Sequence, residues 1–147
     1  MVINETMRKF GAPDTVIHSY RHWSVLLRKP QVTLGALVLA AHDPADRFSS
    51  LSRDSFTELQ AAIQDIEQAL TGAFHYEKIN YLMLMMVDPD VHFHVIPRYR
   101  DRQLFGGMEF TDAGWPGPPD LKPVNTTEED INRKLMEHIR QHWPARQ

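Results

Sequence analysis

Apolar positions in the first part of the chain form short runs that predict β-strands. Runs rich in Val, Ile, Leu and aromatic residues predict strands over 15–20 and 23–29, and the second must stop at Pro30, which lacks an amide hydrogen. The continuously apolar run 36–41 is typical of a strand that is buried on both faces.

Two other segments have the three- and four-residue spacing of amphipathic helices. The first is expected to be capped by Ser52 and ended by Gly72, with an apolar face of Phe56, Leu59, Ile63, Ile66 and Leu70. In the second, Thr126 and Glu129 resemble a capping box that opens a helix over 126–142, with an apolar face of Ile131, Leu135, Met136 and Ile139.

Between these helices the pattern predicts a hairpin and then a loop. Strands are expected over 78–87 and 91–98, and the short turn Asp88-Pro89-Asp90 between them favours antiparallel pairing. Segment 100–124 is rich in Gly and Pro and is therefore expected to be an irregular surface loop. The order of elements indicates an α+β fold.

Composition narrows the class of protein. A chain of 147 residues favours one domain, 1–147, with its core over about 15–98. The net charge of -3 lacks the basic footprint of a binder of long nucleic acid, and the absence of Cys excludes disulfides and thiol catalysis. The longest apolar runs are much shorter than a membrane span of about 20 residues, and segment 1–10 has no apolar signal-peptide region. No membrane partner and a cytoplasmic location are therefore expected.

The chemistry is concentrated in segment 90–98. The two-residue period of a strand places Asp90, His92 and His94 on one face, with the two imidazoles about 7 Å apart. A neutral imidazole can attack phosphorus near neutral pH, and a second imidazole can supply a proton to the departing oxygen. The pair is therefore suited to nucleotidyl transfer.

Two other interpretations of the pair remain open. A His-x-His pair on a strand also suits a divalent metal ion, for which the third ligand would be His42, His18, His22 or Asp90. The pair can also be purely structural.

The segment His-Phe-His-Val-Ile-Pro-Arg, with Asp90 two residues before it, resembles the signature of the histidine-triad (HIT) family. The resemblance extends over about 15–98, because Lys29-Pro30, Leu34-Gly35, an apolar strand, a long helix and segment 78–81 follow one another in the order of that family.

This resemblance implies a fold and an activity. The fold would be a mostly antiparallel five-stranded sheet with two main helices, commonly paired as a homodimer. The activity would be that of a nucleotide hydrolase or nucleotidyl transferase without cofactor or catalytic metal. His92 would attack the α-phosphorus and become nucleotidylated, and His94 would assist the leaving group. The implied substrates are dinucleoside polyphosphates such as diadenosine tetraphosphate, nucleotide sugars and nucleoside phosphoramidates.

Three positions depart from the family pattern. Asp90 replaces the first histidine of the triad, Ala36 stands where many members have a histidine, and only Asp88-Pro89 is expected where members have a phosphate-holding loop. These departures motivate an alternative, a nucleotide-binding protein with little or no turnover.

Other residues are candidates for binding the substrate. Asp90 could support a cationic His92, Arg98 could hold phosphate oxygens, as could Arg100 and Arg102, and Asn80 could face the ligand from within an apolar strand. The resemblance places the base near Ile17, Leu27 and Leu37. Trp115, in the Pro/Gly-rich loop, is expected near the site or across a dimer interface.

Overall fold

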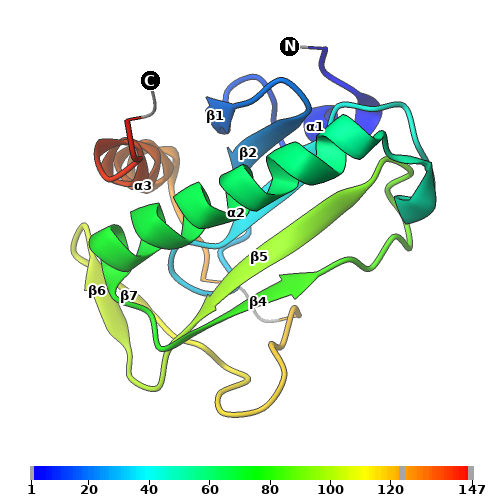
Figure 1. Cartoon of the computed structure of the whole chain (residues 1–147). Coiled ribbons are helices and arrows are strands. Elements are labelled where there is room, and N and C mark those ends of the chain that lie inside the picture. Colours follow the sequence, from blue (N-terminus) through cyan, green and yellow to red (C-terminus); the bar gives the residue numbers. More distant parts are fainter. Residues whose placement is uncertain (1, 123–124, 146–147) are drawn as a thin grey trace.

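A five-stranded antiparallel sheet forms the centre of the computed structural model, which describes residues 2–122 and 125–145 (Figure 1). The strands lie in the order β1-β2-β3-β5-β4. Their bounds are β1 Val16–Ser19, β2 Trp23–Leu27, β3 Leu37–Ala41, β4 Lys78–Leu82 and β5 His92–Arg98.

The inner strands pair in a register that fixes the position of the two histidines. β2 and β3 are buried at every position, as the continuous apolar runs predict. β5 lies between β3 and β4, so that His92 is opposite Ala40, while His94 is opposite Val38 on one side and Leu82 on the other.

Helix α2, Arg53–Phe74, crosses one face of the sheet (Figure 1). The Ser52 hydroxyl accepts a hydrogen bond from the Ser55 amide, which confirms the predicted cap. The predicted end at Gly72 is wrong, because the helix continues to Phe74 and the residue in the left-handed region is His75, with φ 54°. Gly72 instead leaves room for the ring of His142, which would lie 2.9 Å from a Cβ atom.

The main core fills the space between α2 and the sheet. Ile17, Leu27 and Leu37 are at most 7% exposed and belong to this core, together with Ile66 and Leu70 of α2. The expected base slot near Ile17, Leu27 and Leu37 is therefore wrong, since these side chains are packed against one another and the helix.

The opposite face of the sheet is partly covered by α1, Glu5–Lys9, a short helix that the sequence pattern does not reveal. The Asn4 side chain caps it by accepting from the Met7 amide. Met7 packs on Leu26, Val38 and Ala40 of the sheet, which secures α1 beside the beginning of β5.

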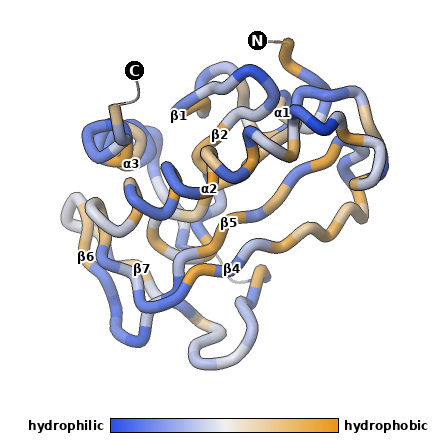
Figure 2. Tube along the Cα trace, in the orientation of Figure 1, coloured by the Kyte–Doolittle hydropathy of each residue, from blue (hydrophilic) through white to orange (hydrophobic). Residues whose placement is uncertain are grey.

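The connection between β4 and β5 is longer than the sequence suggests. Antiparallel pairing is confirmed, but the predicted strand 78–87 ends at Leu82, and 83–91 is a loop in which Met85 has φ 52°. Figure 2 shows a hydrophobic stretch after β4, where the side chains of Met86 and Val87 are 84% and 80% exposed. The predicted short turn is therefore wrong.

Segment 100–122 contains more regular structure than an irregular loop. β6 Gln103–Phe105 and β7 Met108–Phe110 form a hairpin. Gly106 and Gly107 both have positive φ at its turn, as a tight hairpin requires. Residues 123–124 lie outside the described part of the chain.

Helix α3, Glu129–Gln141, begins later than the sequence predicts. The N-cap is Glu128, whose side chain makes no capping bond, while the Thr127 hydroxyl donates to Asn132. The expected capping box of Thr126 and Glu129 is therefore wrong.

A single 3-10 turn, Phe48–Ser50, precedes α2. Among the helices of the described residues, none combines the length and apolarity that a bilayer crossing requires.

Candidate active site

His92 and His94 lie side by side on the face of the sheet that α2 does not cover. Their side chains belong to residues only 2% and 7% exposed, and the ring centroids are 5.1 Å apart with the planes at 78°. The strand period therefore brings the two imidazoles together as predicted.

A backbone hydrogen bond orients the ring of His92. Its Nδ1 lies 2.7 Å from the carbonyl oxygen of Asp90. Because a carbonyl can only accept, Nδ1 must carry the hydrogen, and in the neutral ring Nε2 then has the free lone pair. This arrangement leaves Nε2 available as a nucleophile.

His94 is held by Arg28, at the end of β2. The Arg28 Nε donates to Nδ1 of His94 over 3.3 Å. Burial, followed by the positive charge of Arg28 and by His92, lowers the pKa of His94 to about 4. His94 is therefore neutral near pH 7, with its hydrogen on Nε2.

Arg28 itself has no carboxylate partner within the described residues. Its Nη1 donates to the carbonyl of Pro30 over 2.6 Å, and the residue is half-buried. Burial lowers the pKa of this guanidinium, which remains a cation near neutral pH. A half-buried cation without a counter-ion makes this place attractive for an anion.

The histidines line a hollow of about 270 Å³ between α1 and the loop 83–91. The ring of Phe10 lies 5.9 Å from His92 and 5.7 Å from His94, centroid to centroid. Lys9 forms an ion pair of 2.7 Å with Asp88 of the loop. The remaining lining residues are Arg28, Leu84, Met85, Met86 and Val87.

The carboxylate of Asp90 is turned towards α1. It accepts from the Thr6 amide over 3.1 Å, and the Asp90 amide donates to the Thr6 hydroxyl over 3.1 Å. Asp90 therefore contributes to the site through its carbonyl, which orients His92, and its carboxylate anchors α1. Its contact with substrate stays a prediction.

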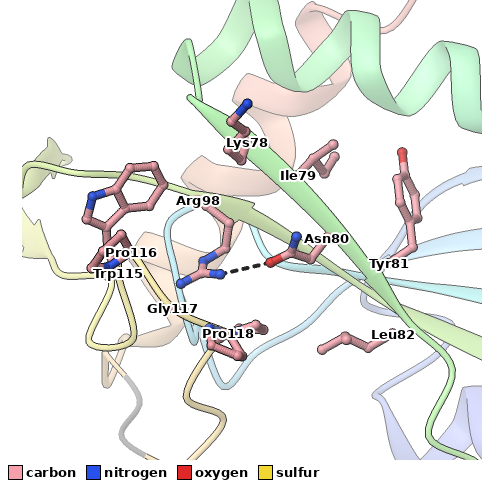
Figure 3. A pocket seen from close by; sticks show the side chains of 11 residues that line it. Lys78, Ile79, Asn80, Tyr81, Leu82, Arg98, Trp115, Pro116, Gly117 and Pro118 are labelled. Atoms are coloured by element: carbon pink, nitrogen blue, oxygen red, sulfur yellow. Dashed lines mark hydrogen bonds between the residues drawn. The ribbon is translucent and has the colours of Figure 1, made fainter.

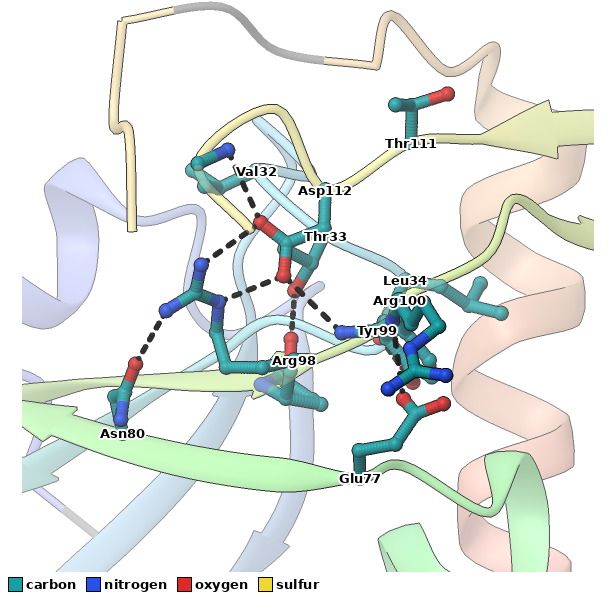
Figure 4. Close-up of polar contacts among 12 residues, drawn as sticks. Val32, Thr33, Leu34, Glu77, Asn80, Arg98, Tyr99, Arg100, Thr111 and Asp112 are labelled. Carbon is teal, nitrogen blue, oxygen red and sulfur yellow. Dashed lines mark hydrogen bonds and ion pairs between the residues drawn. The ribbon is translucent and has the colours of Figure 1, made fainter. Parts of the chain in front are cut away.

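Arg98 lies at the end of β5, and Asn80 lies on the neighbouring strand β4. Both line a different hollow from that of the histidines. The Arg98 guanidinium donates to Asp112 over 2.7 and 3.0 Å and to the Asn80 amide oxygen over 2.8 Å (Figure 4). The side chains of Arg98 and Asp112 are only 4% and 1% exposed. The other phosphate-binding candidates also lie elsewhere: Arg100 donates its amide to Glu77, and Arg102 pairs with Glu109.

The metal interpretation lacks a third ligand. Within 2–122 and 125–145, no three His, Asp or Glu side chains are grouped so that they could hold a metal ion. His42 instead bonds Ser24, His18 stacks on Trp143, and His22 pairs with Asp43. The expected third ligand is therefore not brought to His92 and His94.

The residues of the histidine hollow that sequence reasoning missed include Lys9, Phe10 and Arg28. Arg28 carried a usable signal, because an arginine within a predicted strand whose other members are apolar is expected to need an anionic or polar partner. Lys9 and Phe10 carried none, since nothing local reveals that α1 folds back over β5.

The comparisons with known proteins agree with this geometry. Residues 10–101 match the family model described as HIT domain. No curated protein matches the chain. A histidine triad protein from Bradyrhizobium japonicum has a similar structure, with a TM-score of 0.75, 18% identity and 97% coverage of both chains.

Two further solved structures share the fold. A histidine triad (HIT) protein from Sinorhizobium meliloti has a TM-score of 0.75 and 20% identity, with 96% of both chains covered. A hypothetical histidine triad nucleotide-binding protein from Sulfolobus tokodaii has a TM-score of 0.66 and 16% identity, covering 87% of this chain and 82% of the other. At these identities the likeness concerns the fold.

Proposed function

This chain belongs to the HIT domain family, and from that premise we propose that it is a nucleotide hydrolase or nucleotidyl transferase with His92 as nucleophile. The observation that carries the proposal is the hydrogen bond from His92 Nδ1 to the Asp90 carbonyl, because it leaves the lone pair of Nε2 free within the hollow.

The reaction has two steps. His92 Nε2 attacks the α-phosphorus, an N–P bond forms, and the P–O bond to the leaving group breaks with its electron pair on oxygen. A water molecule then attacks the same phosphorus, and the N–P bond breaks with its electron pair returning to Nε2. The nucleoside monophosphate leaves, and the proton of the water passes to the solvent. In a transferase another hydroxyl group would replace the water.

The neutral state of His94 bears on the leaving group. A neutral imidazole can donate a hydrogen bond from Nε2 to the departing oxygen, but it is a poor source of a full proton. A phosphate leaving group departs as a stable anion, whereas an amine must be protonated. His94 therefore favours phosphoanhydride substrates, such as dinucleoside polyphosphates, over phosphoramidates.

Arg28 supplies positive charge for the phosphoryl oxygens. It lies beside His94, is half-buried and has no carboxylate partner among the described residues, so that an incoming phosphate would provide its missing counter-ion. This role replaces the phosphate-holding part expected of Arg98, whose guanidinium is occupied by Asp112.

The test is phosphate-bond cleavage with diadenosine tetraphosphate, a nucleotide sugar and an adenosine phosphoramidate, with and without a chelator. Wild type is expected to release nucleoside monophosphate, His92→Ala is not, and the chelator should have no effect. Loss of activity with the chelator would instead favour metal-dependent chemistry. Cleavage by His92→Ala at the wild-type rate would exclude His92 as nucleophile.

The alternative is a protein that binds nucleotides with little or no turnover. It is motivated by Asp90, whose carboxylate anchors α1 where the family has a histidine, and by the fully buried Ala36. Mass spectrometry after rapid acid-free quenching distinguishes the hydrolase from the binding protein, because only an active protein would carry a nucleotide on His92.

A homodimer in the cytoplasm is part of the same proposal. Among the described strands, β4 forms an edge of the sheet, and Ile79 and Tyr81 on it are only half-buried. A second β4 could pair with the outer backbone groups of this edge. Sedimentation analysis should give twice the chain mass, and a monomer at all concentrations would exclude the dimer.

A further inference from the structure

The histidine hollow contains a carboxylate, although the proposed substrate is an anion. Asp88, in the loop before β5, lines this hollow together with Lys9 and Arg28. Its side chain is 14% exposed and forms a 2.7 Å ion pair with Lys9 at the end of α1. The lining residues that the structure describes therefore bring two cations and one carboxylate to the place where a phosphoryl group would bind.

The electrostatic influence of Asp88 extends to the histidines. Burial, followed by the charges of Arg28 and His92, lowers the pKa of His94 to about 4. The negative charge of Asp88 acts on the same ring in the opposite direction. The Asp90 carboxylate, in contrast, is directed to the backbone of α1. Asp88 is therefore a carboxylate whose charge a ligand in the hollow would meet.

The buried arginine of the hollow beside β4 is compensated in a different way. Figure 3 shows Arg98 turned towards Asn80, and the same guanidinium is paired with Asp112, whose side chain is 1% exposed. Asp112 is not one of the residues that line that hollow. Its charge supports the fold, whereas the charge of Asp88 also faces whatever occupies the histidine hollow.

The charge on the phosphorus group changes during the proposed reaction. In a nucleoside polyphosphate the α-phosphorus has two bridging oxygens, one to the sugar and one to the leaving group, and therefore carries one negative charge. After water has replaced the leaving group, the new P–OH group ionises with a pKa of about 6, and its proton passes to the solvent. The product monophosphate is therefore a dianion above neutral pH.

We propose that Asp88 determines the charge preference of the histidine hollow, which accepts a phosphoryl group with one negative charge and disfavours a dianionic monophosphate. The proposal rests on the proposed function, because the monophosphate is the product of cleavage at His92. Two cations and one carboxylate are neutralised by one further negative charge, and the second charge of the product finds no cation to compensate it. Asp88 therefore promotes release of the product and limits inhibition by it.

The test is calorimetric titration near pH 8 with adenosine monophosphate, which is a dianion there, and with its phosphate methyl ester, which has one charge. Asp88→Asn should bind the monophosphate about tenfold and the methyl ester about threefold more tightly than wild type, because twice the charge gives twice the interaction energy. The preference for the monophosphate over the ester should therefore rise about threefold.

Asp101→Asn is the matched control, because it removes an exposed carboxylate beyond the other end of β5 that does not line the histidine hollow. It should bind both compounds as wild type does. Equal tightening of both compounds in Asp88→Asn, no tightening, or the same change in Asp101→Asn would overturn the proposal.

A double variant distinguishes charge from a loosened loop. Lys9→Gln/Asp88→Asn removes one charge of each sign, so that the net charge of the hollow is again that of wild type. Its preference between the two compounds should return most of the way to the wild-type value. A double variant that keeps the preference of Asp88→Asn would show that the charge of Asp88 is not the cause.

Cleavage assays separate this proposal from the proposed function. If wild type cleaves diadenosine tetraphosphate, adenosine monophosphate should inhibit Asp88→Asn about tenfold more strongly than wild type, and equal inhibition would overturn the role of Asp88. If wild type cleaves no substrate, the proposed function fails, and the two titrations still decide on Asp88. Binding of neither compound by any of the four proteins would overturn the charge preference.

Discussion

The two ends of β5 have basic side chains on the same face of the sheet, but a carboxylate compensates the positive charge at only one of them. At the beginning of the strand, His94 is kept neutral and Arg28 beside it has no carboxylate partner among the described residues. At the end, Arg98 is buried against Asp112, with two hydrogen bonds between them.

The cost of removing a charged side chain from water explains why this difference matters. A buried charge is costly unless a partner compensates it, and Asp112 compensates Arg98 within the folded chain. Near the histidines the compensation is incomplete, so that an anionic ligand would complete it. A cation that already has its counter-ion supports the fold, whereas one that lacks it is available for binding.

The largest expected effect is on catalysis at the first end. His92→Ala removes the proposed nucleophile and should lower kcat for diadenosine tetraphosphate by about 10³-fold or more. Its thermal unfolding midpoint should change far less than its activity. A variant that retains more than about a tenth of the wild-type kcat would contradict the role of His92.

The next effect concerns stability at the second end. Asp112→Ala leaves the Arg98 charge buried and unpaired, and should lower the free energy of unfolding by about 3–5 kcal/mol in urea denaturation. Glu109→Ala is a matched control, because it breaks the exposed pair with Arg102 and should cost at most about 1 kcal/mol. Similar losses in both variants would show that burial does not distinguish these pairs.

A pH experiment tests the neutral state of His94. The pKa of His94 is about 4 when folded, below the ordinary value of 6.5, so the unfolded chain takes up a proton first as the pH falls. The folded state should therefore lose stability between pH 6.5 and about 4, by at most about 3 kcal/mol from this group.

His94→Gln provides the comparison, because it keeps a possible acceptor for Arg28 but does not titrate. Its free energy of unfolding should fall less steeply over this pH range than that of wild type. Parallel curves for the two proteins would contradict a lowered pKa at His94.

The smallest expected effect concerns substrate affinity at the histidine hollow. Arg28→Gln removes a cation proposed to hold phosphate, and should raise KM by about 10- to 100-fold, since a hydrogen bond to a charged group contributes about 1.5–3 kcal/mol. Lys29→Gln changes the net charge equally at the next residue and should have a much smaller effect. Equal changes in KM would point to general electrostatics rather than to Arg28 itself.

Regular and local features of this molecule were readable from the sequence. The apolar runs predicted the inner strands, Ser52 predicted the start of α2, and the two-residue period predicted that His92 and His94 are neighbours. In each case the signal lies in the local pattern of residues, although β3 and β5 pair from distant parts of the chain.

The errors arise where distant contacts override local patterns. Gly72 lies within α2 and leaves room for the His142 ring, and the apolar run after Leu82 leaves the sheet to form one wall of the histidine hollow. The partner of Arg98 was not predictable for the same reason, since Asp112 reaches it through the folding of a segment that had no clear pattern. The roles of Arg98, Asn80 and Asp90 in binding substrate stay predictions.

The position of α1 has a practical consequence for producing the protein. Thr6 and Lys9 tie this helix to Asp90 and Asp88, and Phe10 contacts both histidines. An affinity tag or fusion partner attached at the amino end would therefore sit a few residues from the site. A chain shortened to residues 10–101, the part that matches the family model, would lose the helix that shields the histidines from solvent.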